Sequence, residues 1–395
     1  MPEQTQGSNL PAFDLFKESL FLGLGGVLGP LRPDRLSPAQ KIVFGILGLW
    51  APMAILAAVQ GSAFVPSQPQ SFLKDPAMYA RFLLVFPLIF VSQKKISAML
   101  RLVSDHFLKA QIVKAEEREK YIGNIDAVMR LRYSPVVDWL ILAVVTASSA
   151  IAIRMIVPGL PATWRTLGPE SRRQLTWAGW WLYVVSDPIL AFVLLRFVYR
   201  IGLWWRLLWQ TSHLDLQLDA AHPDSVGGIG FLGLTLRSFK EAGFAVSALL
   251  AGGLADIVLA TGARVTTFKF EIAMMVIAVT ALFAGPLMFF HDLLRRTKYR
   301  GYIEYGELWQ RQRRQFAEKW MRSSPERPEL LNIHDFSEAT DLSEILERVQ
   351  QIQLMPFRQA QILPLIISVV APFALVALLE FPVAEVMKVL LKMVF

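Results

Sequence analysis

Seven stretches of the chain are apolar over the length that crosses a lipid bilayer. Residues 42–61 and 272–291 are the clearest, because each runs for roughly 20 residues without a formal charge and so matches about 30 Å of hydrocarbon. The others are residues 76–93, 139–157, 175–195, 242–263 and 359–379. The pattern predicts an all-α, polytopic transmembrane bundle of about seven spans.

Composition agrees with this pattern. The chain has 395 residues, of which 54% are hydrophobic and 18% charged, and this is more apolar surface than a water-soluble domain of that length needs to bury. It has no cysteine, which excludes disulfides, thiolate metal sites and thiol nucleophiles. The net charge is +8, but the cations cluster beside the spans. They therefore indicate contact with lipid headgroups, and nucleic acid is not expected as a partner.

The cations also predict an orientation. Of the 40 Lys and Arg residues, 30 precede the first span or follow the second, fourth and sixth, and 10 fall on the other side. The positive-inside rule then places the N-terminus in the cytoplasm and the C-terminus outside. We divide the chain into a cytoplasmic N-terminal segment (1–41), spans one to six with cytoplasmic helical loops (42–291), a cytoplasmic helical segment (292–358), and the last span with an exoplasmic amphipathic helix (359–395). Residues 13–28 are expected to lie along the cytoplasmic interface.

Three spans are predicted to continue as helices into the cytoplasm. Apolar residues recur at three- and four-residue spacing beyond the second and the sixth span, as they do in a helix with one buried face. Together with residues 197–218 after the fourth span, we expect these extensions to pack as a cytoplasmic helical layer. Trp204, Trp205 and Trp209 belong either to this layer or to an aromatic belt at the headgroups.

Several ionisable residues fall inside the spans, where a charge costs about 2.5–3.5 kcal/mol on insertion scales. Asp187 precedes Pro188 near the middle of the fourth span, and Asp256 follows a run of small residues in the fifth. We take these two and Arg154 as candidates for pathway or gating charges, with Arg154 as the expected partner of a carboxylate. The alternative is a buried ion pair that only fixes helix packing.

A second candidate site lies after the fourth span. It contains His213, Asp215, Asp219, His222 and Asp224, followed by Gly227, Gly228 and Gly230. If residues 211–222 are helical, one face presents two carboxylates and an imidazole, a set that could hold a divalent metal ion. The alternative is that these residues cap helices and form hydrogen bonds while the glycines permit a tight turn. No zinc-protease, phosphate-loop or hydrolase motif is present, so an enzyme is not the favoured class.

Short motifs in this region carry a resemblance. His222-Pro223-Asp224, Gly227-Gly228 and Gly230-Phe231, with Asp341-Leu342 and Met355-Pro356-Phe357, resemble a group of uncharacterised bacterial multi-span membrane proteins. The resemblance implies the bacterial inner membrane as the location. It implies no reaction and no functional residues.

From these patterns we expect a homo-oligomeric ion channel or small-solute transporter, in which the cytoplasmic helices form a vestibule or sensor. Two other hypotheses remain open. One is a membrane-bound, metal-dependent enzyme that uses the His and Asp cluster, and the other is a structural or signalling membrane protein.

The first testable prediction concerns topology. The N-terminus, His106, His222 and His334 should face the cytoplasm, while Arg165 and Phe395 should face outward, because of the unequal distribution of cations. Reporter fusions at these positions measure the orientation. Termini on the same side of the membrane would contradict the count of seven spans.

Overall fold

The computed structural model describes residues 13–16, 37–64, 71–156, 163–168, 174–320 and 333–378, of which about 81% are helical. In this part of the chain, seven helical stretches are long and apolar enough to cross a membrane. They are Ala39–Val59, Pro76–Lys109, Pro135–Met155, Trp177–Ser212, Lys240–Leu259, Val265–Glu318 and Gln359–Ala377. Each overlaps one predicted span, so the prediction of seven apolar helices is confirmed. Their length and composition indicate an integral membrane protein.

Most of these stretches consist of several helical elements. In chain order they are α1 (Pro38–Leu49) with α2 (Ala51–Val59), then α3 (Pro76–Met78), η4 (Tyr79–Val85) and α4 (Phe86–Lys109), then α6 (Pro135–Ile151) with η6 (Ala152–Ile156). The fourth comprises α7 (Trp177–Trp181), η9 (Leu182–Ser186) and α8 (Asp187–Ser212), and the fifth is α10 (Lys240–Thr261). The sixth comprises η11 (Val265–Phe268), α11 (Lys269–Ala284), η12 (Gly285–Phe290) and α12 (His291–Trp320), and the seventh is α14 (Gln359–Ala377).

Shorter elements connect the spans. They are η3 (Phe72–Lys74), η5 (Ala115–Glu117), α5 (Arg118–Arg132), η10 (Gly230–Gly233), α9 (Leu234–Ser238) and α13 (Ile333–Gln350). Strands β1 (Thr166–Leu167) and β2 (Gln174–Leu175) pair antiparallel, with Thr166 opposite Leu175. Some boundaries follow directly from the sequence. Ser37 and Gln40 form a capping box at the start of α1, and Asp75 caps α3 by accepting hydrogen bonds from the amides of Ala77 and Met78.

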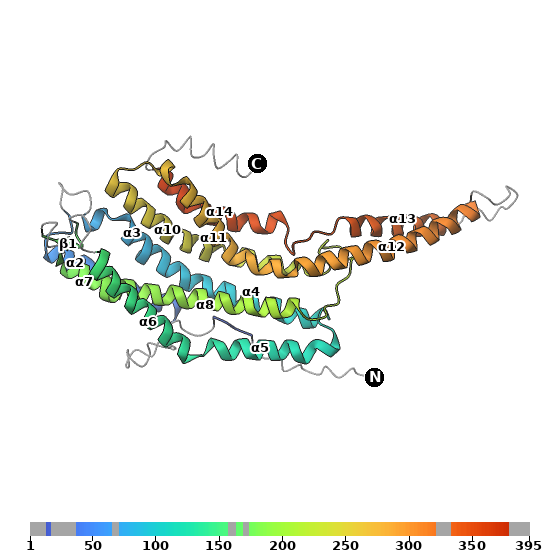
Figure 1. Cartoon of the computed structure of the whole chain (residues 1–395), viewed down its shortest axis with the longest axis horizontal. Helices are drawn as coiled ribbons and strands as arrows, with labels where there is room; N and C mark the ends of the chain where they lie inside the picture. The colour runs from blue at the N-terminus through green and yellow to red at the C-terminus, as the bar shows by residue number, and fades with distance from the viewer. Residues whose placement is uncertain are drawn as a thin grey trace.

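The spans run side by side, and α4, α8 and α12 continue beyond them at one end of the bundle, here called the extension end (right in Figure 1). The opposite end, with the β1–β2 hairpin, α2 and α7, is the loop end. At the extension end α12 and α13 form a helical hairpin that projects past the other helices.

The helix α10 is the central span. Over its apolar window 56% of residues are buried inside the protein, compared with 11% for the span that contains α6, which is peripheral. It packs against α14, α11, α4, α3 and η4. Small residues allow this close packing. A Cβ on Gly252 would lie 3.1 Å from the Cβ of Ala80, and one on Gly243 would lie 3.0 Å from Leu365 Cδ1.

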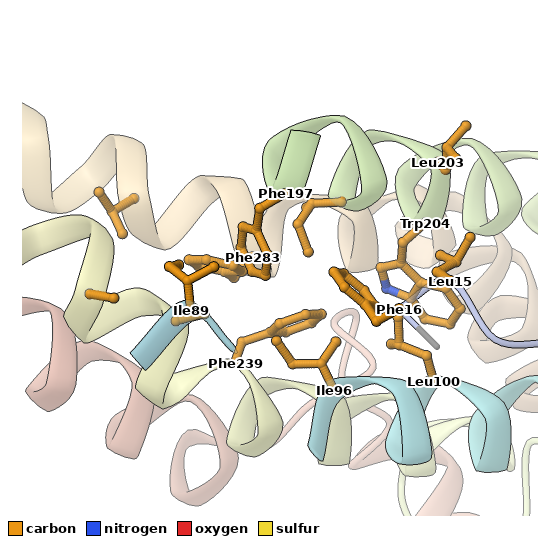
Figure 2. Close-up of a cluster of buried hydrophobic side chains, with 14 of the residues drawn as sticks. Leu15, Phe16, Ile89, Ile96, Leu100, Phe197, Leu203, Trp204, Phe239 and Phe283 are labelled. Carbon is orange, nitrogen blue, oxygen red and sulfur yellow. The ribbon is translucent and has the colours of Figure 1, made fainter. Parts of the chain in front are cut away.

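One hydrophobic core continues from the spans into the extensions (Figure 2). Ile96 and Leu100 of α4 face Phe197 and Trp204 of α8, and all four are buried. The predicted helical layer is therefore present, and the unassigned residues 118–132 contribute α5 to it. Of the three tryptophans of α8, some belong to this layer and some to a surface belt.

Trp204 belongs to the layer, since it is 1% exposed. Trp209 is 50% exposed, as in a surface aromatic belt. Trp205 is part-buried and donates a hydrogen bond to the carbonyl of Leu282.

One other prediction needs correction in part. Residues 13–28 were expected at the cytoplasmic interface, but Phe13, Leu15 and Phe16 are buried in the core because α4 and α8 offer them apolar contacts. The remaining residues of that prediction, 17–28, and the exoplasmic amphipathic helix expected at the end of the chain lie outside the described residues.

A substitution on α10 tests its close packing. Gly252→Leu should lower stability by about 1–3 kcal/mol, because the new side chain overpacks the crossing with α3 and η4. Gly253→Leu is the matched control, since a Cβ there meets no atom within 4 Å. Thermal unfolding in detergent micelles measures both. Equal losses for the two variants would contradict the crossing as described.

Candidate functional site

An ion pair joins the second and the fourth span. Arg81 of η4 places Nη1 at 3.3 Å from Oδ1 and 3.4 Å from Oδ2 of Asp187, the first residue of α8. Arg154 was expected to partner a carboxylate, and this prediction is wrong. Its side chain is exposed in η6, and no carboxylate among the described residues pairs with it. Asp187 instead faces η4, where Arg81 is available.

Asp256 has a different partner. Arg165, in the loop before β1, places Nη2 at 2.9 Å from Oδ2 of Asp256 and also forms an ion pair with Asp75. Trp164 Nε1 donates to Oδ2 of Asp75 at 2.9 Å. The Arg165 side chain is 16% exposed, so this loop inserts a guanidinium among the ends of three spans.

The local sequence explains how the loop reaches this depth. Gly179 lies directly beneath it, and a Cβ at that position would be 2.3 Å from the carbonyl oxygen of Arg165. Only glycine permits this approach. Thr176 fixes the neighbouring turn, because its hydroxyl donates to the carbonyl of Trp164 and accepts from the Gly179 amide.

Asp75 and Arg165, which lie outside the span helices, both stay charged. Burial would raise the pKa of Asp75, but the Arg165 guanidinium and the hydrogen bonds from Arg165, Trp164 and Met78 outweigh it and hold that pKa below its ordinary value. Burial acts in the opposite sense on Arg165, and the charges of Asp75 and Asp256 outweigh it, so the pKa of Arg165 is raised.

The backbone is irregular beside three of the charges in the spans. Within the described ranges, three segments are π-helical: η4, η6 and η9. η4 contains Arg81, η6 contains Arg154, and η9 ends one residue before Asp187. A π turn widens the helix, leaves backbone groups less regularly paired, and is frequent at functional sites.

The second and fourth spans share one further feature. After η4 come Phe86 and Pro87, and after η9 come Asp187 and Pro188. Each proline lacks the amide that would bond to the preceding turn, so each helix is weakened at its π segment. The two helices that form the ion pair therefore carry the same kind of local hinge.

The proposed His and Asp helix face does not form. The helix α8 ends at Ser212, and residues 213–229 are not helical, so Asp215, Asp219 and His222 do not share a face. Asp215 pairs with Lys114, and the Asp219 carboxylate accepts from the Ala221 amide at 2.9 Å. Over the described ranges no group of three or more His, Asp or Glu side chains could hold a metal ion. These side chains act locally as hydrogen-bond partners.

Asp224 organises the glycine turn. Its Oδ1 accepts from the amides of Val226 at 2.9 Å and Gly228 at 3.1 Å, and its Oδ2 accepts from the Gly230 amide at 2.9 Å. Gly227 and Gly228 lie in this turn with φ of 68° and 93°, a backbone region that favours glycine. Burial would raise the pKa of Asp224, but these three amides and His222 lower it overall.

The same turn contacts the segment that leads into α14. The amide of Gln353 donates to the carbonyl of Ser225 at 2.8 Å, and Arg358 Nη2 donates to the carbonyl of Asp224 at 3.2 Å. The motif at residues 222–231 and the motif at 355–357 are thus neighbours in space. Together they fix the connection between the α12–α13 hairpin and the last span.

Comparisons with known proteins give no identity. No family model, no curated protein and no solved structure matches the chain.

Sequence reasoning missed two partners. Arg81 is visible as an ionisable residue in a span, but nothing in the sequence shows that it faces Asp187 rather than lipid. Arg165 lies in a short connection between spans, where an arginine is ordinarily read as solvated. The adjacent Trp164, which is 1% exposed, is a weak signal that this connection is buried.

A substitution in the glycine turn tests the role of Asp224. Asp224→Ala should lower stability by about 1–3 kcal/mol at neutral pH, because three amides lose their acceptor. Its folded pKa lies below the unfolded value of about 3.9, so the contribution is complete above that value and is lost as pH falls through the folded pKa.

Thermal unfolding in detergent from neutral to acid pH measures this difference between variant and wild type. Asp292→Ala is the control, because that side chain is 68% exposed in a surface pair. A deficit in Asp224→Ala that stays constant to the lowest pH would contradict the assignment.

Proposed function

We propose that the protein moves or gates an ion or a small solute across the bilayer, and that the Arg81–Asp187 pair is the charged gate of that pathway. The observation that carries this is the pair itself, placed between two spans that each have a π segment and a proline beside the charge. Because each of the two helices has a hinge beside its charge, the contact between Arg81 and Asp187 is suited to opening and closing.

The geometry of the pair supports a gate rather than a fixed bond. Its N to O distances of 3.3 and 3.4 Å exceed the roughly 2.7–2.9 Å of a tight charge-assisted hydrogen bond. The side chains of Arg81 and Asp187 are 25% and 28% exposed, so the protein does not seal them. A loosely held pair at this depth fits a path for water or an ion.

A second ion pair in the same helix provides the contrast. Arg196 of α8 pairs with Asp138 of α6, where the side chains are only 5% and 17% exposed and neither residue adjoins a π segment. We assign that pair to helix packing.

Asp256 is held by Arg165 at the loop end, and we assign these two residues to a fixed charge cluster at the outer mouth of the pathway. Arg154 stays a candidate pathway charge, exposed in η6.

The wider setting is part of the proposal. The extension end faces the cytoplasm and the loop end faces outward, in agreement with the distribution of cations. The chain works as a homo-oligomer in the bacterial inner membrane, and its extension helices form the vestibule. No described observation favours a metal-dependent enzyme, so no reaction is proposed.

Flux through reconstituted vesicles tests the gate. We expect purified wild-type protein to conduct at least one of Na⁺, K⁺, Cl⁻ and H⁺, and Asp187→Asn to change that flux by about tenfold, the effect of roughly 1.4 kcal/mol on a barrier. Asparagine removes the charge and keeps the volume. Asp138→Asn is the matched control and should lower thermal stability while leaving flux close to wild type.

Two outcomes would overturn the proposal. One is a fully incorporated wild-type protein that conducts none of these ions and passes none of a panel of small solutes. The other is Asp187→Asn with wild-type flux at equal incorporation, which would make Arg81–Asp187 a packing pair like Arg196–Asp138.

A further inference from the structure

Two carboxyl groups share one guanidinium nitrogen at the loop end of the bundle. Nη2 of Arg165 forms an ion pair with Oδ2 of Asp75 and also with Oδ2 of Asp256, the second at 2.9 Å. The carboxyl groups of Asp75 and Asp256 lie within hydrogen-bonding reach of each other. Two ionised carboxylates at such a separation repel, and a proton between them removes the repulsion. This is the geometry of an acid pair that shares a proton.

Tyr183 connects this acid pair to the Arg81–Asp187 pair. It lies in η9, four positions before Asp187, and its hydroxyl accepts a hydrogen bond from the Arg165 guanidinium. The charges of Arg165 and Asp75 also act on the Asp187 carboxyl group. The outer charge cluster and the Arg81–Asp187 pair therefore form one electrostatic network.

This network contains one more carboxyl group than guanidinium group. The carboxyl groups are those of Asp75, Asp187 and Asp256, and the guanidinium groups are those of Arg81 and Arg165. If all five groups were ionised, one negative charge would be in excess among these described residues. Such a charge is costly beside the apolar part of the bundle, and binding of one positive charge neutralises it.

The surroundings of the two acids favour Asp256 as the group that takes the proton. Asp75 is 4% exposed, and the amides of Ala77 and Met78 donate to its Oδ1, while an indole N–H and Arg165 donate to its Oδ2. These donors stabilise the ionised form of Asp75. Within the described part of the chain, Arg165 is the one hydrogen-bond donor to Asp256, whose side chain is 23% exposed. Asp256 can therefore exchange a proton with water.

The oxygens that are left free fit a proton and not a metal ion. Both oxygens of Asp75 already accept from donors, so Asp256 offers the free carboxyl oxygen of the acid pair. A metal ion such as Ca²⁺ or Mg²⁺ requires several oxygen ligands, and over the described ranges no three His, Asp or Glu side chains could hold one. A proton requires a single oxygen.

We propose that Asp256 binds a proton that enters from the loop end, and that H⁺ is the ion that the pathway takes up at its outer mouth. Proton binding stands on the geometry of the acid pair, whereas transport of H⁺ rests on the proposed function. On release, the O–H bond of the Asp256 acid breaks, its electron pair stays on the carboxylate, and the proton passes to water. Arg165 is then shared by two anions, and Tyr183 carries this change of charge toward Asp187.

Infrared spectroscopy tests proton binding without any transport assay. At neutral pH the wild type should show the C=O stretching band of a protonated carboxylic acid, and this band should be absent in Asp256→Asn. The band should shift in ²H₂O, because the Asp256 side chain is 23% exposed. Asp138→Asn is the control and should keep the band, since that carboxylate has an arginine of its own, Arg196.

A second variant distinguishes a shared proton from an acid that is only buried. In Asp75→Asn the neutral amide no longer competes for Arg165, so Asp256 becomes the counter-ion of this guanidinium and ionises. The acid band should then disappear although Asp256 is intact. If Asp75→Asn does not fold, the comparison of wild type with Asp256→Asn still decides whether Asp256 holds a proton.

Flux under a pH gradient identifies the ion. Vesicles that contain the wild type and a pH-sensitive dye should take up H⁺, and Asp256→Asn should lower the rate at least about tenfold, because asparagine cannot bind and release a proton. Asp138→Asn should stay close to the wild-type rate at equal incorporation.

Each outcome supports or overturns a defined part of the proposal. Absence of an acid band that depends on Asp256 overturns proton binding. A band that persists in folded Asp75→Asn overturns the shared proton. H⁺ flux that is absent from the wild type, or unchanged in Asp256→Asn, overturns H⁺ as the transported ion and leaves the gate open to another ion. A wild type that passes neither ions nor small solutes overturns the proposed function and leaves the infrared result valid.

Discussion

A charge inside an apolar slab is costly unless an opposite charge or water compensates it, and the pairs that meet this requirement link helices of the bundle to one another. Arg81 and Asp187 connect η4 to α8, Arg196 and Asp138 connect α8 to α6, and Arg165 connects a loop to α10 through Asp256. Each pair joins elements far apart in the chain. Breaking the buried Arg196–Asp138 pair would leave an uncompensated buried charge that costs several kcal/mol, so that pair selects one arrangement of helices even where its net contribution to stability is small.

The positions of the helices follow from the sequence, whereas the partners of the charges do not. An apolar run of roughly 20 residues has one stable solution in a bilayer, because a helix satisfies its own backbone. The partner of Asp187 depends on how two spans are rotated about their axes. Arg154 and Arg81 are both ionisable residues in neighbouring spans, and only the fold shows that Arg81 is the partner. Likewise, helical spacing placed Asp215 and His222 on one face, but α8 ends at Ser212.

Local chemistry was more predictable when one residue determined the backbone. Gly227 and Gly228 require positive φ, and Asp75 before Pro76 caps a helix, because both effects act over a few residues. The position of Phe13 and Phe16 had no such local signal. A mixed polar and apolar segment before the first span ordinarily reads as interfacial, and its burial depends on contacts with α4 and α8, which are distant in the sequence.

The proposed gate requires stiff helices with defined weak points beside the ion pair. The run from Phe86 to Lys109 is regular α-helix, as is the run from Asp187 to Ser212, and both begin where a π segment ends. In the proposed gate each helix therefore turns as a rigid lever, and the bend concentrates at η4 and η9, where the prolines have removed a backbone hydrogen bond. Arg81 and Asp187 lie at these bends. Under this proposal, movement of either helix acts first on a pair whose N to O distances of 3.3 and 3.4 Å exceed those of a tight charge-assisted hydrogen bond.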